Sequence, residues 1–314
     1  MEHSAGAEAF QGDDGRMTAV TDADAHPHDL AALGAALVTV LFWASAFVGI
    51  RSAGKTFAPG ALSLGRLLVA AAVLGAVMLM RDEQLPRSAD LRAIGRPLLL
   101  CGLLWFGAYN VALNSGERRV DAGTAAMLVN VGPVLIAIVA GFVLREGFPR
   151  ALFTGCGVAF AGVVVIAVAS SSRSATTTGV LLCLAAAAAY AGGVVAQKVV
   201  LRRLSPLQTI FLCCVIGATA CSPFAAQLGH ELGSARGTSI GWVVYLGLFP
   251  TALGFMTWAF ALSRTDAGRL AATTYLVPPI SVLLGWLILS ETPASLAYLG
   301  GALCLAGVGL SRRR

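Results

Sequence analysis

Residues 121–146 read DAGTAAMLVNVGPVLIAIVAGFVLRE, and residues 266–291 read DAGRLAATTYLVPPISVLLGWLILSE. Both stretches begin with Asp-Ala-Gly, carry a proline at the same place and end on a glutamate, at a constant offset of 145 residues (266 − 121). The residues between these markers are mostly apolar, and each stretch is long enough to cross a bilayer, which takes about 20 residues of helix. The shared register indicates that the second half of the chain repeats the first.

The repeat extends beyond these two stretches in both directions. Downstream, the same offset pairs Gly155 with Gly300 and Gly162 with Gly307. Upstream, the offset is 147 (190 − 43) instead of 145, which a small change of loop length explains. At this offset Trp43 pairs with Tyr190, Arg51 with Lys198 and Pro59 with Pro206.

Apolar stretches of membrane length fill the chain from Leu30 onward. Of its 314 residues, 57% are hydrophobic and only 12% are charged, whereas a soluble domain has about 25% charged residues. We therefore predict an all-α integral membrane protein with ten transmembrane helices. The predicted spans are residues 30–50, 60–80, 97–115, 122–144, 150–170, 178–198, 206–226, 239–262, 267–289 and 294–311.

The ten predicted spans divide into two units of five. Residues 30–170 form the first repeat and residues 178–311 the second, and residues 1–29 precede them as a disordered cytoplasmic tail, because they hold seven of the 16 acidic residues and no apolar run. Since five is odd, the second unit enters the membrane inverted relative to the first. Inverted repeats are the usual architecture of alternating-access transporters, with the substrate bound at the repeat interface.

The basic residues predict the orientation. With the N-terminus inside, 15 of the 22 Lys and Arg residues fall in cytoplasmic segments and six in outer segments, and Arg66 lies within a span. This positive-inside bias predicts that both termini are cytoplasmic, in a multi-pass protein of the cell (inner or plasma) membrane. The net charge of +6 is therefore a topology signal, and no nucleic-acid partner is expected.

The apolar regions carry no pattern typical of a hydrolase. No H-E-x-x-H motif occurs, and none of the four histidines lies in a predicted span. The seven cysteines lie inside apolar spans and are interpreted as small packing residues. Gly49 to Thr56 match a phosphate-binding loop, but they follow a membrane-length helix instead of a buried strand. We therefore predict no enzyme, no catalytic residue, no metal and no cofactor.

Arg66 is the one charge that lies more than three residues from the end of a predicted span. A charge inside the membrane is costly and indicates a functional site by default. The alternative is that its long side chain reaches the outer interface or a backbone carbonyl. If Arg66 faces a cavity, it favours a substrate with a carboxylate or another anionic group.

Polar and aromatic residues within the spans complete the candidate site. Polar groups in a membrane usually face protein or water, so each candidate alone could join helices instead of binding a ligand. Together they predict a cavity with aromatic walls and a few hydrogen-bonding groups, suited to a small amphipathic molecule. With Arg66, the predicted substrate-binding residues are Trp43, Ser45, Tyr109, Asn110, Asn130, Tyr190, Trp258 and Tyr275; Trp105, Asn114, Gln197, Thr257, Thr273 and Thr274 are further polar or aromatic residues within spans.

The repeated prolines and acidic residues have predicted structural roles. Pro133 and Pro278 each remove a hydrogen bond within a span, and the resulting bends are either hinges for alternating access or static kinks. Glu146 and Glu291 are predicted to cap or orient the helix that follows each of them. Asp121 and Asp266 are predicted to be N-caps.

These residues resemble those of the EamA-type members of the drug/metabolite transporter superfamily. The resemblance covers nearly all of the chain after residue 29 and is carried by Phe42-Trp43-Ala44-Ser45-Ala46-Phe47, by Arg66-Leu67-Leu68, and by the repeated proline, glutamate and glycine pattern. It implies a secondary transporter with ten helices, often an exporter of amino acids, other metabolites or drugs. Small four-helix relatives couple transport to protons through a buried Glu, whereas no acidic residue lies deep in a predicted span of this chain.

We therefore expect a secondary transporter of a small organic metabolite, amino acid-like or amphipathic and drug-like, that works as an exporter by alternating access. An importer or facilitator of the same solutes remains open as an alternative, as does a membrane-embedded enzyme or a receptor-like scaffold. The expected partners are the small-molecule substrate and the lipid bilayer, and a homodimer remains open.

Overall fold

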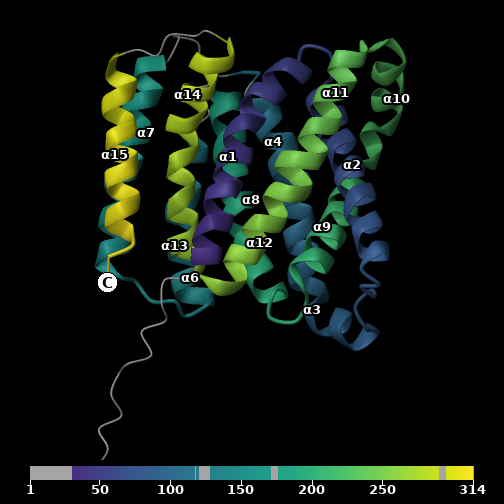
Figure 1. The fold of residues 1–314 in the computed structure, drawn as a ribbon, viewed down its shortest axis with the longest axis horizontal. Helices are drawn as coiled ribbons and strands as arrows, with labels where there is room; N and C mark the ends of the chain where they lie inside the picture. The colour runs from purple at the N-terminus through teal and green to yellow at the C-terminus, as the bar shows by residue number, and fades with distance from the viewer. Residues whose placement is uncertain (1–29, 117, 120–127, 171–175, 290–294, 314) are drawn as a thin grey trace, which may run out of the picture.

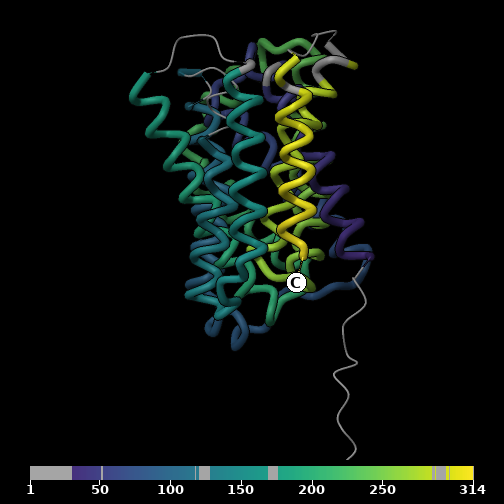
Figure 2. Tube along the Cα trace, turned by 90° about the vertical axis from the view of Figure 1, so that its left-hand side faces the viewer, coloured from purple at the N-terminus to yellow at the C-terminus, as the bar shows by residue number. Residues whose placement is uncertain are grey.

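Helices make up all the regular structure in the described part of the chain (Figure 1). The computed structural model describes residues 30–116, 118–119, 128–170, 176–289 and 295–313. The helices form one bundle, and α1 begins at the end of the bundle where the C-terminus lies, as the two views at right angles show (Figures 1 and 2). We refer to this end as the terminal end of the bundle and to the other as the far end.

In the first half of the chain, most helices follow the predicted spans closely. The structure begins with α1 (Leu30–Ala53) and α2 (Pro59–Met80). One continuous helical rod follows, made of α3 (Ser88–Leu100), the π-helical segment η1 (Cys101–Ala108) and α4 (Tyr109–Gly116). After the undescribed segment come α6 (Gly132–Val143) and α7 (Arg150–Ser170).

The second half contains more interruptions. Its helices are α8 (Thr177–Val200), α9 (Pro206–Ala220), the short 3₁₀ turn η2 (Ser222–Phe224) and α10 (Ala225–Ser234), followed by α11 (Gly237–Leu246), the π-helical η3 (Gly247–Leu253) and α12 (Gly254–Arg264). The last rods are α13 (Ala267–Ala272), the 3₁₀ segment η4 (Thr273–Leu276), α14 (Val277–Leu289) and α15 (Ser295–Ser311).

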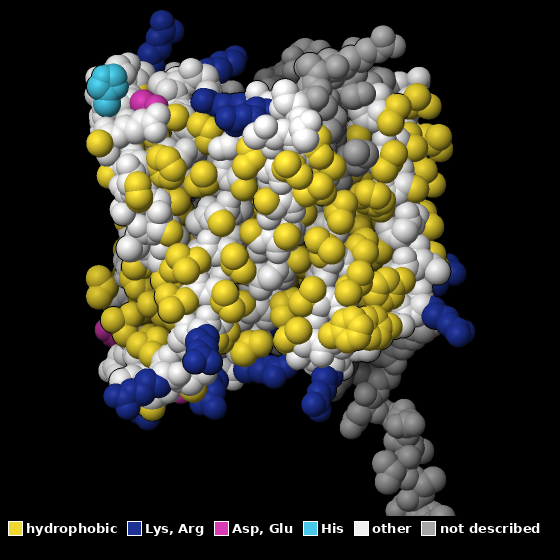
Figure 3. Space-filling model, turned by 180° about the vertical axis from the view of Figure 1, so that it is seen from behind, with side chains coloured by type: hydrophobic (Ala, Val, Ile, Leu, Met, Phe, Trp, Pro, Cys, Tyr) yellow, Lys and Arg dark blue, Asp and Glu magenta, His cyan; other side chains and the backbone are white. Residues whose placement is uncertain are grey.

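Seven helical rods within the described residues are long and apolar enough to cross a membrane, and an eighth is obtained if the bent pair α9 and α10 counts as one span. Two shorter apolar helices, Gly132–Val143 and Tyr298–Ser311, accompany them. Hydrophobic side chains cover the middle of the visible face, and Lys and Arg gather toward its two ends (Figure 3). The chain is therefore a multi-pass membrane protein, while the number of ten spans remains a prediction.

Two predicted spans differ from the helices observed. The rod predicted at residues 97–115 begins at Ser88 and continues through Pro97 to Gly116. The span predicted at 206–226 is bent by 58° after Ala220 and continues to Ser234. Pro97 and Pro223 account for these differences, because a proline lacks the N–H of the helical ladder but does not always end the helix.

Local sequence signals explain several helix ends. Ser205 caps α9 with its hydroxyl, and Gln208 returns a side-chain bond to the Ser205 N–H, which makes a complete capping box. Pro206 occupies the first turn, where its missing N–H has no cost. Thr176 caps α8 through Gly179 N–H.

The small-residue faces of α7 and α15 pack directly on each other. A Cβ atom added at Gly300 would lie 2.6 Å from the carbonyl oxygen of Gly162, and one added at Gly307 would lie 2.6 Å from that of Gly155. Small residues allow this approach because helices in lipid associate through packing and not through exclusion of water. Figure 2 shows the two helices side by side.

The predicted roles of Glu146 and Asp266 need correction. Glu146 does not cap α7, the helix that follows it; its carboxylate accepts hydrogen bonds from the N–H groups of Ala267 (2.8 Å) and Gly268 (3.2 Å), at the start of α13. The left-handed backbone of Arg145 (φ 60°) and Gly147 (φ 74°) lies on either side of Glu146 and turns it away from α7. Asp266 occupies the N-cap position of α13, but its side chain makes no capping bond.

Several predictions fall outside the described residues. These are the tail at residues 1–29, the cap at Asp121, the role of Glu291 and the start of the span predicted at 122–144.

Candidate substrate cavity

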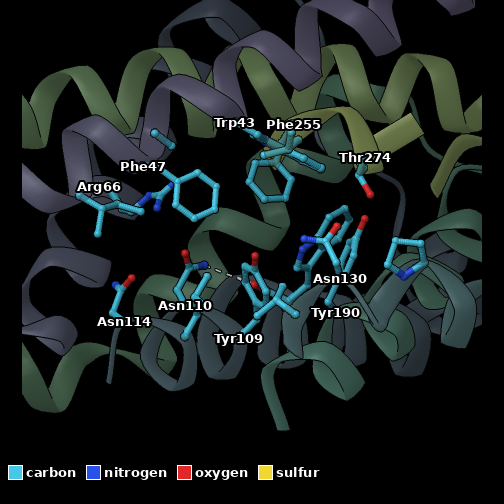
Figure 4. A pocket seen from close by; sticks show the side chains of 17 residues that line it. Trp43, Phe47, Arg66, Tyr109, Asn110, Asn114, Asn130, Tyr190, Phe255 and Thr274 are labelled. Atoms are coloured by element: carbon cyan, nitrogen blue, oxygen red, sulfur yellow. Dashed lines mark hydrogen bonds between the residues drawn. The ribbon is translucent and has the colours of Figure 1, made fainter. Parts of the chain in front are cut away.

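A cavity lies among the helices, with about 800 Å³ of empty space that includes the open space at its mouth. Side chains from both halves of the chain line it (Figure 4). The lining residues are Trp43, Ala46, Phe47, Ile50, Arg66, Trp105, Tyr109, Asn110, Leu113, Asn114, Val129, Asn130, Pro133, Tyr190, Phe255, Thr274 and Val277.

The cavity occupies the part of the bundle nearer the far end. Its lining residues on α1 begin at Trp43, halfway along a helix that starts at the terminal end. On α2, which runs back from the far end, Arg66 lies only two turns after Pro59. On α4, Asn114 lies two residues before the end of the helix at Gly116.

Arg66 lies at one end of the cavity, and a hydrogen bond holds the Nε edge of its guanidinium. Only 6% of the residue is exposed. Its Nε–H donates to Thr251 Oγ1 (2.8 Å), and the Thr251 hydroxyl donates in turn to the carbonyl of Leu246 (2.7 Å). The π-helical turn η3 leaves this carbonyl within reach of Thr251, five residues later. The Nη edge of the guanidinium is therefore the part that remains for the cavity.

Asn110 and Asn114 are both on α4, and their side chains lie beside that of Arg66 (Figure 4). The amide nitrogen of Asn110 donates to the carbonyls of Phe106 (2.9 Å) and Trp105 (3.3 Å). That of Asn114 donates to the Ser63 hydroxyl (3.1 Å) and to the carbonyl of Pro59 (3.4 Å). Carbonyl oxygens only accept hydrogen bonds, so the orientation of both amides follows from these contacts.

Aromatic rings form the opposite end and the wall of the cavity. The Trp105 ring centroid lies 4.9 Å from that of Phe255 and 5.3 Å from that of Tyr190, and Trp43 lies 5.3 Å from Phe255. Such separations are typical of stacked or edge-to-face aromatic pairs. Tyr109, 5.9 Å from Tyr190, continues this wall toward Asn110.

A family model described as the EamA-like transporter family matches residues 30–168 and 177–313. The chain belongs to the EamA-like transporter family. This membership identifies it as a transporter and not as an enzyme.

Curated relatives agree with this membership. The chain is 36% identical to a probable terminal-alkyne amino-acid exporter of Streptantibioticus cattleyicolor, over 90% of this chain and 94% of the relative. It is 30% identical to the uncharacterized transporter YdfC of Bacillus subtilis, over 85% of this chain and 86% of the relative. A solved crystal structure with 21% sequence identity has a TM-score of 0.74 and covers 90% of this chain and 96% of the other, which shows a shared fold.

In this EamA-family chain, six of the nine predicted substrate-binding residues line the cavity. They converge from α1, α2, α4, α8 and the turn before α6. The six are Trp43, Arg66, Tyr109, Asn110, Asn130 and Tyr190.

The other three predicted residues lie outside the cavity. Ser45 faces α11, where its hydroxyl accepts from Tyr245 (2.7 Å) and donates to the carbonyl of Phe42 (2.8 Å). Trp258 is fully buried behind Trp43, with ring centroids 5.0 Å apart. Tyr275 is fully buried in a second apolar cluster with α7 and α15. None of the three lines the cavity. Residue type alone does not reveal which side of a helix faces the cavity.

The predicted hinges lie at helix starts. Pro133 lines the cavity in the first turn of α6, and Pro278 lies in the first turn of α14, directly after the 3₁₀ segment η4. The backbone hydrogen-bond pattern therefore changes from 3₁₀-helical to α-helical just before Pro278. Whether the two prolines act as pivots remains a prediction.

Eleven of the 17 lining residues were absent from the predicted set of nine, among them Phe47, Phe255, Asn114 and Thr274. Phe47 is one helical turn after Trp43, and Asn114 one turn after Asn110, so helical spacing could have identified both. Phe255 lies at the start of α12, after the π-helical segment η3, and Thr274 lies in the 3₁₀ segment η4. These irregular segments change the direction in which nearby side chains point. α-Helical spacing therefore does not predict which of these side chains face the cavity.

Proposed function

We propose that this chain is a secondary transporter that exports a small organic metabolite, amino acid-like or amphipathic, by alternating access between two inverted five-helix halves. The observation that carries the proposal is a cavity deep among the helices that side chains from both halves of the chain line. Transporters with inverted repeats bind substrate where the repeats meet. Arg66 and Asn110 enter from the first half, and Tyr190 and Phe255 from the second.

The ten-helix layout is supported by a repeated irregularity. The π-helical segment η1 begins at Cys101 and η3 begins at Gly247, an offset of 146 residues (247 − 101). Their ends, Ala108 and Leu253, are offset by 145 (253 − 108). π-helical segments are rare and often occur at functional sites. The same irregularity in the third span of each half is expected of an internal duplication.

Contacts at the terminal end support a closed state on that side. Glu146 caps α13, and Lys198 at the end of α8 donates from Nζ to the carbonyls of Leu262 and Thr265 (2.6 Å to the latter) at the end of α12. These bonds tie the α6–α7 connection and α8 to the α12–α13 connection. With both termini cytoplasmic, as the positive-inside bias predicts, the chain is in an outward-facing state.

Export and amino acid-like substrates are supported by similarity. The relative from Streptantibioticus cattleyicolor is named a probable terminal-alkyne amino-acid exporter, and a relative from Escherichia coli K12, 26% identical over 87% of this chain, is named an inner membrane transporter. Import of the same solutes is the alternative, because an alternating-access cavity works in either direction along a gradient.

The direction of transport is tested in cells that lack the chain or overproduce it. Intracellular amino-acid pools are measured by mass spectrometry after a pulse of dipeptides that release amino acids inside the cell. An exporter predicts accumulation of one solute class in cells that lack the chain and depletion on overproduction. The opposite pattern, with uptake increased on overproduction, would establish an importer.

A further inference from the structure

The Arg66 end of the cavity contains a buried cation without an anionic partner. Among the residues that the structure describes, no Asp or Glu forms an ion pair with Arg66. Its one hydrogen bond goes to a neutral hydroxyl, that of Thr251. A buried charge without a counter-charge is unfavourable in a membrane protein unless water or a ligand compensates it. An arginine offers paired N–H groups that match a carboxylate in a bidentate geometry.

Two unused acceptors lie beside this cation. The Asn110 and Asn114 side chains are each 6% exposed, and their amide nitrogens are already engaged with protein acceptors. No residue in the described part of the chain donates to either Oδ1, and both side chains line the cavity beside Arg66 (Figure 4). Two amide oxygens that accept no hydrogen bond from a described residue suit a ligand that brings N–H groups.

Beyond these groups the cavity becomes aromatic. Trp43, Trp105 and Phe255 form a continuous wall, and Tyr190 lies at its far side, 5% exposed. This region can take up an apolar or unsaturated group.

We propose that the cavity binds the zwitterionic head of an α-amino acid. The carboxylate lies against the Nη groups of Arg66, the ammonium donates to Oδ1 of Asn110 and of Asn114, and an apolar side chain extends along the aromatic wall. The inference rests on the proposed function, because it names the substrate class of the same cavity.

The two parts of the head explain why neither a plain amine nor a plain acid is sufficient. A plain amine would bring a cation to the buried guanidinium of Arg66 without an anion to offset it. A plain carboxylic acid would leave the two asparagine oxygens without donors. A site built to pair a polar group discriminates strongly against analogues that lack it, since its own buried groups are then left unpaired.

The test uses wild-type full-length protein in liposomes and three matched sets of probes. Each set holds an amino acid, its decarboxylated amine and its deaminated acid: L-leucine with 3-methylbutylamine and 4-methylpentanoate, L-phenylalanine with phenethylamine and 3-phenylpropanoate, and L-propargylglycine with its two analogues. We expect at least one amino acid to be transported about 10-fold or more faster than both of its analogues, the factor that one charged hydrogen bond supplies.

Three outcomes separate this inference from the function on which it rests. Equal or faster transport of the amines or of the acids in every set would overturn it. Transport confined to solutes of another class in a wider metabolite pool would also overturn it while leaving the transporter function intact. An absence of flux for every solute would instead count against the proposed function.

Single variants assign the two parts of the head. In Arg66→Met, the ratio of the transport rate of the amino acid to that of the amine is expected to fall by about 10-fold. In Asn110→Leu, the ratio of the amino acid to the deaminated acid is expected to fall by about 10-fold. Ser45→Ala is the matched control, because Ser45 faces α11 and not the cavity. Size-exclusion profiles verify folding, and a folded Arg66→Met protein that keeps the wild-type preference would overturn the assignment.

Discussion

The carboxylate of Glu146 accepts a hydrogen bond from the backbone N–H of Ala267, 121 residues later in the chain, at 2.8 Å. A second bond, from Gly268 N–H at 3.2 Å, completes the cap. A carboxylate at a helix N-terminus satisfies free N–H groups and interacts favourably with the helix dipole. One side chain from the first half of the chain thus fixes the start of a helix in the second half.

Removing this cap is expected to destabilise the protein. Glu146→Ala should lower the free energy of unfolding by about 1–2 kcal/mol, the usual cost of losing a capping side chain. The measurement is thermal unfolding in detergent, and Asp266→Ala is the matched control. Asp266 occupies the N-cap position without a capping bond, so this variant should change stability by less than about 0.5 kcal/mol. An equal effect of the two variants would contradict the assignment of the cap to Glu146.

Lys198 should act together with Glu146. Its ammonium donates to two carbonyls at the end of α12, and Glu146 binds the first N–H groups of α13, so both hold the same short connection. Lys198→Met is expected to cost about 1–3 kcal/mol, because charged hydrogen bonds are lost. In a double-mutant cycle, the combined variant should cost at least about 0.5 kcal/mol less than the sum of the single variants. Strict additivity would show that the two side chains stabilise independent parts of the protein.

The contact between α7 and α15 leaves no room for a side chain at Gly155. A Cβ atom there would lie 2.6 Å from the carbonyl oxygen of Gly307, which is backbone and cannot move aside. Gly155→Leu should therefore separate the helices and reduce the yield of monodisperse protein severalfold, since overpacking costs about 1–3 kcal/mol or more. Gly157→Leu, on the same helix with no atom within 4 Å of its Cβ, should keep the wild-type yield. Similar losses for both would show that α7 tolerates no leucine for reasons unrelated to this contact.

Trp258 and Trp43 should respond differently to substitution. Trp258 is fully buried and does not line the cavity, whereas Trp43 is half-buried and lines it. Trp258→Ala is expected to lower stability by about 3–5 kcal/mol, as for other large core truncations. Trp43→Phe keeps an aromatic surface and should mainly raise the KM of transport severalfold. Thermal unfolding and flux measured on the same preparations check both results, and a change in KM for a well-folded Trp258 variant without loss of stability would contradict the placement.

Hydrophobic length and the internal repeat predict much of the fold from sequence. Runs such as residues 60–80 are uniformly apolar, so their helices follow the prediction within a few residues, as α2 (Pro59–Met80) does. The packing of Gly162 against Gly300 is also predictable, because small residues recur on one helical face. The partner of Glu146 was not predictable, since it depends on a left-handed turn at Arg145 and Gly147 that brings together segments far apart in the chain.

The candidate site could be predicted only in part, for a related reason. Arg66 was identifiable because a charge within a span is rare. Ser45 and Tyr275 were polar residues in the right spans, but they face other helices. The facing of α12 depends on the π-helical segment η3 that precedes it, which shifts the helical phase. Phe255 therefore reaches the cavity, whereas Trp258, one turn further along, is buried behind Trp43.

The central claim is that the cavity carries a small organic solute across the membrane. The most direct test is uptake into liposomes that contain the purified full-length protein, with a pooled amino-acid and metabolite mixture read by mass spectrometry against empty liposomes. The account predicts saturable flux of at least one solute class, reduced about 10-fold or more in Arg66→Met and unchanged in Ser45→Ala. No protein-dependent flux of any solute, with or without an imposed ion gradient, would contradict it.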